Sequence, residues 1–188
     1  DLDKLKFPDL TIQGRYARAR ALIAGNRQKK FVVANTRVNY LDRLKLLRGY
    51  EEAYSDPLLY PDGCDELLGR LCEAQMTVVR QFADMGVDGI FWCDDLGCQD
   101  RPIYSPEVFR KHFKPYYKRV YDYAHSRGLI TFLHSCGHIL ELLGDLKDAG
   151  LDVIQFDQQE NMGLDNLARR FGGKICFWCP VDIQTTMT

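Results

Sequence analysis

Short, continuously apolar runs alternate along this chain with longer segments that have a helical period. The clearest of these longer segments extends from about Asp65 to Met85, where apolar side chains recur every three or four residues. Strands that are apolar on both faces and alternate with helices indicate a parallel sheet covered by helices. The apolar runs predict five strands, near residues 31–35, 89–93, 129–133, 152–156 and 175–178.

Glycine separates the expected helices from the strands that follow them. Gly86, Gly128 and Gly150 each stand just before an apolar run, where a left-handed residue suits the end of a helix. Two shorter helices are expected at Leu41–Leu47 and Tyr50–Tyr54, with a break at Ser55-Asp56-Pro57. A further helix is expected from Ile139, directly after the third strand.

Five parallel strands fit two architectures. One is an open, doubly wound α/β domain, and the other is an incomplete (β/α)8 TIM barrel, which when closed has eight strands in about 250 residues. The chain starts at Asp1 without an initiator Met and ends at Thr188 just after a strand-like segment. We therefore expect residues 1–188 to be a partial barrel domain that lacks its first and last parts. Its two open sheet edges could pair with another copy and form a homo-oligomer.

The overall composition excludes several classes of function. The chain is 46% hydrophobic and 27% charged with a net charge of −1, which gives no support to binding of nucleic acid or of a membrane surface. No apolar run approaches the roughly 18 residues of a membrane helix. Seven cysteines without a framework-like spacing indicate free thiols and a cytoplasmic location.

Polar, ligand-type side chains follow every expected strand, which is the layout of an active-site rim in such folds. After the third strand come His134 and Cys136, two residues apart on an extended segment, so their side chains point to the same side. An imidazole and a thiolate could bind Zn²⁺ together with one more protein ligand and an open position. The alternative is a small buried cysteine beside a hydrogen-bonded core histidine.

Other strand ends supply further candidates. Asp94 and Asp95 are adjacent, so only one can face the barrel axis, where it could orient a substrate or act as a general acid or base. Cys179 could be a third metal ligand or a packed thiol before Pro180. The candidates for substrate contact are Arg37, Tyr104, Asp157 and Asp182.

Several segments together resemble the uroporphyrinogen decarboxylase superfamily, and most of all its cobamide-dependent methyltransferases. They are Asp94-Asp95-Leu96-Gly97-Cys98-Gln99, Tyr104-Ser105-Pro106-Glu107-Val108-Phe109, Lys114-Pro115-Tyr116 and His134-Ser135-Cys136-Gly137-His138. The resemblance implies a (β/α)8 barrel of which this chain supplies about the third to seventh strands.

In that methyltransferase branch, a His-x-Cys pair and a distant Cys bind zinc, which activates the thiol of coenzyme M or a related acceptor. The methyl group comes from a methylcobamide on a corrinoid partner protein. His134 and Cys136 match the first two ligands, whereas the third would be expected beyond Thr188, since Cys179 lies too early. Asp182 belongs to a turn that stands where the decarboxylases have the sequence Gly-Asn-Leu-Asp.

Three functions follow from these observations. The leading hypothesis is a zinc-dependent, corrinoid-using methyltransferase with a small thiol substrate. The alternative enzyme is a metal-free uroporphyrinogen decarboxylase, a lyase with a tetrapyrrole substrate. The third hypothesis is an inactive fragment or interaction piece, and we expect residues 1–188 alone to have neither activity at a normal rate.

Overall fold

The computed structural model describes residues 2–26 and 29–187, so Asp1 and Thr188, the ends of the expected domain, lie outside the described part. Within that part all strands join one parallel sheet in the order β1-β2-β3-β4-β5. Each strand pairs with the next one along the chain, which is the order of a barrel, whereas a doubly wound sheet reverses its order. The strands are β1 (Val33–Asn35), β2 (Gly89–Cys93), β3 (Ile130–His134), β4 (Val153–Gln155) and β5 (Cys176–Trp178).

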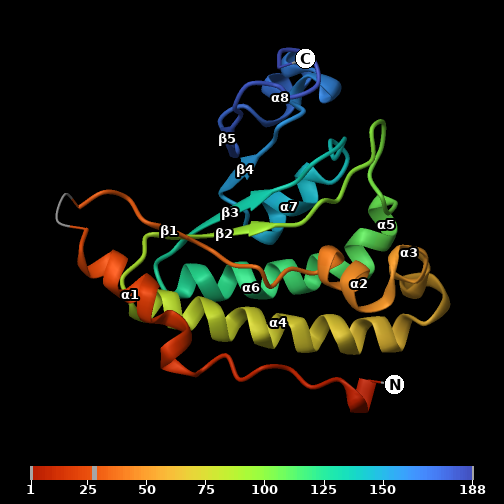
Figure 1. Cartoon of the computed structure of the whole chain (residues 1–188). Coiled ribbons are helices and arrows are strands. Elements are labelled where there is room, and N and C mark those ends of the chain that lie inside the picture. Colours follow the sequence, from red (N-terminus) through yellow and green to blue (C-terminus); the bar gives the residue numbers. More distant parts are fainter. Residues whose placement is uncertain (1, 27–28, 188) are drawn as a thin grey trace.

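Helices follow the strands in turn, which confirms the α/β fold of an incomplete barrel (Figure 1). The helices are α1 (Ala17–Ala24), α2 (Leu41–Arg48), α3 (Tyr50–Leu59), α4 (Pro61–Asp84), α5 (Pro106–Val108), α6 (Lys114–Ser126), α7 (Leu143–Ala149) and α8 (Leu164–Phe171). Short 3-10 turns lie at Leu2–Lys4, Gln13–Tyr16 and Gln159–Met162, and a π-helical turn at Phe109–Phe113 leads into α6. Among the described helices, none is both long and apolar enough to cross a membrane.

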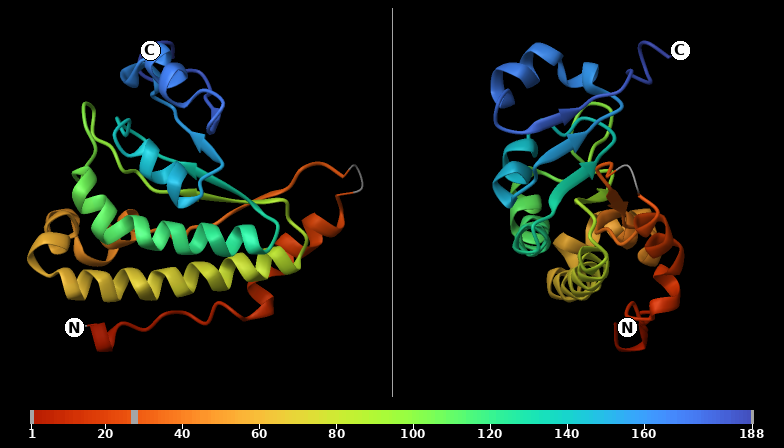
Figure 2. Two further views of the ribbon diagram at one scale, coloured as in Figure 1. Left: turned by 180° about the vertical axis from the view of Figure 1, so that it is seen from behind. Right: turned by 90° about the vertical axis from the view of Figure 1, so that its left-hand side faces the viewer.

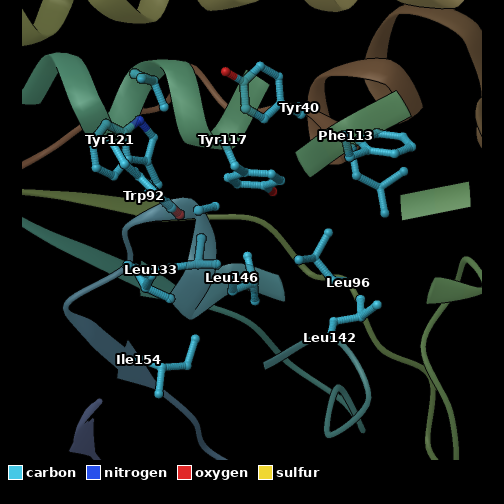
Figure 3. Packing of buried hydrophobic residues seen from close by; sticks show 14 of the residues in the cluster. Tyr40, Trp92, Leu96, Phe113, Tyr117, Tyr121, Leu133, Leu142, Leu146 and Ile154 are labelled. Carbon is cyan, nitrogen blue, oxygen red and sulfur yellow. The ribbon is translucent and has the colours of Figure 1, made fainter. Parts of the chain in front are cut away.

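One face of the sheet is covered by helices and forms the core. In Figures 1 and 2 the long helices α4 and α6 run side by side along that face, and the N-terminal segment lies on the far side of α4. Alternate strand residues point into the core, and Figure 3 shows Trp92 beside Tyr121 of α6, with Leu133 and Ile154 in the same cluster. These residues are fully or almost fully buried.

The other face of the sheet carries the intervening strand residues and is more open. Val33, Ile130 and Trp178 are exposed there, while Phe91 and Phe132 are half-buried. Phe91 contacts Trp178 across the curve of the sheet, with ring centroids 5.7 Å apart. In a barrel this is the inner face, so the residues that stand on it at the carboxyl ends of the strands are those that can reach a substrate. Pairing of copies along the edge strands β1 and β5 stays a prediction.

The expected break at Ser55-Asp56-Pro57 is wrong, because α3 continues through Pro57 to Leu59. Proline has no N–H to donate to the carbonyl four residues back, which is that of Ala53. The hydroxyl of Tyr104 donates to this carbonyl instead. A side chain from a distant loop thus satisfies the acceptor that the proline leaves free.

Two helix starts also differ from expectation. α4 begins at Pro61 rather than near Asp65, since proline fits the first helical position, where no N–H is needed. α7 begins at Leu143 rather than at Ile139. The intervening residues form a turn that buries Ile139, Leu140 and Leu142 in the core.

Candidate metal centre

The candidate site stands where β2, β3 and β4 end on the inner face. Cys93 pairs in register with His134, and His134 pairs with Gln155. Side chains alternate between the faces of a strand, so the residues two positions further on, Asp95 and Cys136, lie on the same face. The register of three neighbouring strands therefore brings these groups together.

His134, Cys136 and Asp95 form a compact cluster. The Cys136 Sγ lies 3.3 Å from the His134 Nε2, and that nitrogen lies 3.6 Å from the Asp95 Oδ1. The Cys136 backbone N–H also donates to the Asp95 Oδ1, at 2.9 Å. One ligand atom from each residue lies within 4.8 Å of the other two, and all three residues are half-buried.

Two glycines make this approach possible by bringing together the loops after β2 and β3. Gly137 has φ +80°, and a Cβ built on it would lie 2.4 Å from the backbone of Gly97. A Cβ on Gly97 would in turn lie 2.7 Å from the backbone of Gly137. The loops are joined by the His138 N–H, which donates to the Cys98 carbonyl at 2.7 Å. Only residues without side chains allow the two backbones this close.

A second layer of polar groups holds the imidazole. The His134 Nδ1 is hydrogen-bonded to the Gln155 Oε1. The amide Nε2 of the same glutamine donates to the Asp157 Oδ1 at 2.5 Å. Next to this pair, the Gly137 N–H donates to the Gln158 Oε1 at 2.7 Å, which ties the loop after β3 to the loop after β4.

The thiol of the cluster ionises only if a cation binds beside it. Burial, with a smaller contribution from the Asp95 carboxylate, raises the pKa of Cys136 to about 12. Without a positive charge beside it, the sulfur therefore stays protonated at neutral pH. A bound cation reverses this balance, because a coordinating thiol is deprotonated.

The donor set fits zinc. Imidazole nitrogen, thiolate sulfur and carboxylate oxygen are the ligand types of Zn²⁺, and three protein ligands with one open position are the arrangement of a catalytic site. The Nδ1 hydrogen bond to Gln155 is the kind of outer contact that metal-binding histidines make. The candidate ligands His134 and Cys136 are thus brought together, while their role as ligands stays a prediction.

Asp94 lies on the opposite face from this cluster. It is 1% exposed, and its carboxylate accepts hydrogen bonds of 2.8–3.0 Å from the backbone N–H groups of Tyr40, Leu41 and Asp42 at the start of α2. The Tyr117 hydroxyl donates to it as well, at 2.7 Å. Burial raises the pKa of Asp94 to about 6. Asp94 therefore holds the N-terminus of α2 against β2, and Asp95 is the member of the pair that faces the site.

The expected substrate residues are distributed differently. Tyr104 is buried, stacks on Phe113 and bonds to Ala53, and Asp182 is buried and accepts backbone N–H groups of its own loop, such as that of Gln184. The polar groups of Tyr104 and Asp182 are thus bonded within the fold.

Arg37, Asp157 and Cys179 also lie at strand ends. Arg37 is exposed and Asp157 half-buried, so both remain open to a substrate. Cys179 is exposed and lies outside the cluster of ligand atoms found among the described residues, where Asp95 takes the third place instead.

A cleft of about 330 Å³ opens beside the cluster, and sequence reasoning missed its lining. Its walls are Asp42, Lys45, Leu46, Tyr50 and Asp95, so α2 and the start of α3 form one side and the candidate cluster the other. Lys45 is ion-paired with Asp42 and lies 5.8 Å from the centroid of the Tyr50 ring. In the sequence these residues have the pattern of an ordinary exposed helix face. They line the cleft because Asp94 holds the start of α2 against the end of β2.

Comparisons with known proteins place the chain in a family and agree with its fold. The sequence model of the family described as uroporphyrinogen decarboxylase matches residues 45–182. No curated protein matches the chain. Among seven similar chains of solved structures is a methyltransferase from Methanosarcina mazei, at 18% identity and a TM-score of 0.68. The similarity covers all of this chain and 65% of the methyltransferase, so the chain spans somewhat less than two thirds of that protein.

Proposed function

Since the chain belongs to the uroporphyrinogen decarboxylase family, we propose that its barrel serves a zinc-dependent methyltransferase that uses a thiol as acceptor. The single observation that supports this reaction most is the convergence of His134, Cys136 and Asp95 at the mouth of the sheet. The fold similarity to a methyltransferase is consistent with it, although at 18% identity that similarity concerns the fold.

His134, Cys136 and Asp95 are the proposed ligands. Zinc bound there would leave one position for the sulfur of an acceptor and would favour its thiolate form at neutral pH. The Cys136 N–H bond to Asp95 orients the carboxylate, and Gln155 orients the imidazole. The chain's own part is thus to present three fixed donors toward one point.

The cleft beside Asp95 is the proposed place of the acceptor. Leu46 and Tyr50 can cover the apolar part of the small molecule, while Lys45 is held by its ion pair with Asp42. A methylcobamide on a partner protein would supply the methyl group, which would pass to the acceptor sulfur as the carbon–cobalt bond broke, with the electron pair of that bond left on the corrinoid.

We further propose that the activity belongs to a complete barrel of which residues 1–188 form part. The chain covers only 65% of the similar methyltransferase, and its inner sheet face is partly exposed. Further strands would close the barrel over that face.

The experiment uses the full-length protein with zinc, methylcobalamin and a panel of small thiols, and follows the corrinoid spectrum. We expect methyl transfer in the wild type, its loss in C136S and its retention in C179S. Equal rates in wild type and C136S would contradict the proposal. Turnover of uroporphyrinogen without zinc would instead establish the lyase reaction.

A further inference from the structure

A chain of hydrogen bonds runs from Asp157 through Gln155 to His134, and it has only one consistent polarity. We propose that Asp157 sets the tautomer of His134 through Gln155, so that the Nδ1 carries the proton and the Nε2 faces the cluster with a free lone pair. The consequence for metal binding rests on the proposed function, whereas the tautomer itself does not.

The polarity follows from what each group can donate. An ionised carboxylate only accepts hydrogen bonds, so the Gln155 group that faces Asp157 must be the amide NH₂, as observed at 2.5 Å. The opposite atom of the amide, Oε1, only accepts, and it is the atom bonded to His134. The His134 Nδ1 must therefore carry a proton. A neutral imidazole has one N–H, so the Nε2 is left unprotonated.

The relay is held by the sheet. Gln155 is 9% exposed and is the last residue of β4, where it pairs in register with His134 at the end of β3. Asp157 stands two residues later, and its carbonyl accepts the Ile183 N–H at 2.9 Å, which fixes the loop that bears it. The Gln155 amide and the His134 ring are thus held by paired strands, and Asp157 by a hydrogen-bonded loop.

The free lone pair points where the site needs it. The His134 Nε2 lies 3.3 Å from the Cys136 Sγ and 3.6 Å from the Asp95 Oδ1. In the other tautomer an N–H would occupy this direction, and the nitrogen could not bind a cation until the proton moved. Asp157 and Gln155 are therefore positioning residues, and Asp157 acts two hydrogen bonds away from the ligand nitrogen.

The direct test is nitrogen NMR of metal-free protein labelled with ¹⁵N-histidine. Spectra are recorded at about pH 8, above the usual pKa of ~6.5 for histidine. The His134 signals are assigned by their absence in H134Q. We expect a protonated Nδ1 and an unprotonated Nε2. A protonated Nε2 in the wild type would overturn the inference, whether or not the protein binds zinc.

Two variants test the direction of the relay. In D157N the new amide can accept as well as donate, so the Gln155 amide can turn over and offer its NH₂ to His134, and we expect the Nε2–H tautomer to gain population. The double variant Q155E/D157N exchanges amide and carboxylate along the relay. The carboxylate that it introduces accepts from both sides, which restores the Nδ1–H tautomer. The same tautomer populations in all three proteins would overturn the proposal.

The matched control is D165N, the same chemical change in the exposed first turn of α8. It should leave the His134 spectrum unchanged. Zinc affinity, measured by competition with a chelator, gives a second readout: we expect D157N to bind about 10–100-fold more weakly than wild type and the double variant to regain part of the loss. If wild type binds no zinc, the proposed function fails while the spectra still decide the tautomer.

Discussion

Asp94 and Asp95 are neighbours in the chain, yet their carboxylates serve opposite faces of the sheet. Asp94 accepts the free N–H groups of α2 in the core, and Asp95 lies 3.6 Å from His134 at the open inner face. The helix that Asp94 anchors lines the cleft beside Asp95. One dipeptide at the end of β2 thus connects the packing of a helix to the geometry of the site.

This division predicts that D94N and D95N change the free energy of unfolding by very different amounts. D94N replaces one of two acceptor oxygens with a donor that faces backbone N–H groups, so we expect the free energy of unfolding to fall by about 2 kcal/mol. D95N keeps an acceptor for the Cys136 N–H at a half-exposed position and should change it by less than about 0.5 kcal/mol. Urea unfolding measures both. Equal losses of stability would contradict the assignment.

The buried carboxylate also predicts a pH dependence. Burial raises the pKa of Asp94 from 3.8 to about 6, so the folded protein holds its proton more tightly than the unfolded chain does. Its contribution to stability is complete below about pH 4 and is lost as the pH rises through 6, with an amplitude of about 3 kcal/mol at 1.36 kcal/mol per unit.

The difference in unfolding free energy between wild type and D94N isolates this contribution, because other carboxyl groups cancel. Asp9 and Asp182 act in the opposite direction, because their pKa values are lowered. At Asp182 burial acts to raise the pKa, but hydrogen bonds from backbone N–H groups together outweigh it, and at Asp9 the hydrogen bonds of Thr11 lower it. A difference that does not vary between pH 4 and 7 would contradict the raised pKa.

The contact between Gly97 and Gly137 predicts a specific cost for G137A. A methyl group there would meet the Gly97 backbone at 2.4 Å, in addition to the strain of a positive φ. G128A is the matched control, since Gly128 has φ +75° but nothing within 4 Å of the added atom.

We expect G128A to cost about 1 kcal/mol and G137A about 1–3 kcal/mol more. Because the clash drives apart the loops that carry Asp95 and Cys136, G137A should also weaken zinc binding, which G128A should leave intact. Similar effects of the two substitutions on stability and on zinc binding would show that the loop contact is unimportant.

The helix through Pro57 predicts an unusual role for Tyr104. Y104F leaves the buried Ala53 carbonyl without its donor, and we expect the unfolding free energy to fall by about 2 kcal/mol. Y60F, at an exposed tyrosine after α3, should have little effect. If P57A rescues Y104F by restoring a backbone donor, the account of this helix is correct; no rescue would argue against it.

The sequence predicted the strands, the barrel type and the pairing of His134 with Cys136, because apolar runs, glycine stops and the two-residue period of a strand are local signals. It could not decide between Asp94 and Asp95. Phe91 and Trp92 are both apolar, so nothing in the run tells which side faces the helices. Gln155 was missed for a similar reason, since its partnership with His134 depends on the register of two strands. The break expected at Pro57 was wrong because the donor that replaces the missing proline N–H, the Tyr104 hydroxyl, lies far from it in the sequence.

Zinc binding by the purified protein tests the central claim most directly. Metal-free protein is titrated with Zn²⁺ against a competing chelator, and stoichiometry and affinity are compared among wild type, H134A, C136S, D95N and C179S. We expect one zinc per wild-type chain, no specific binding in H134A or C136S, binding about 10-fold or more weaker in D95N, and wild-type binding in C179S. A wild type without zinc, or a C136S that binds it as tightly, would contradict the assignment of this cluster as a metal centre.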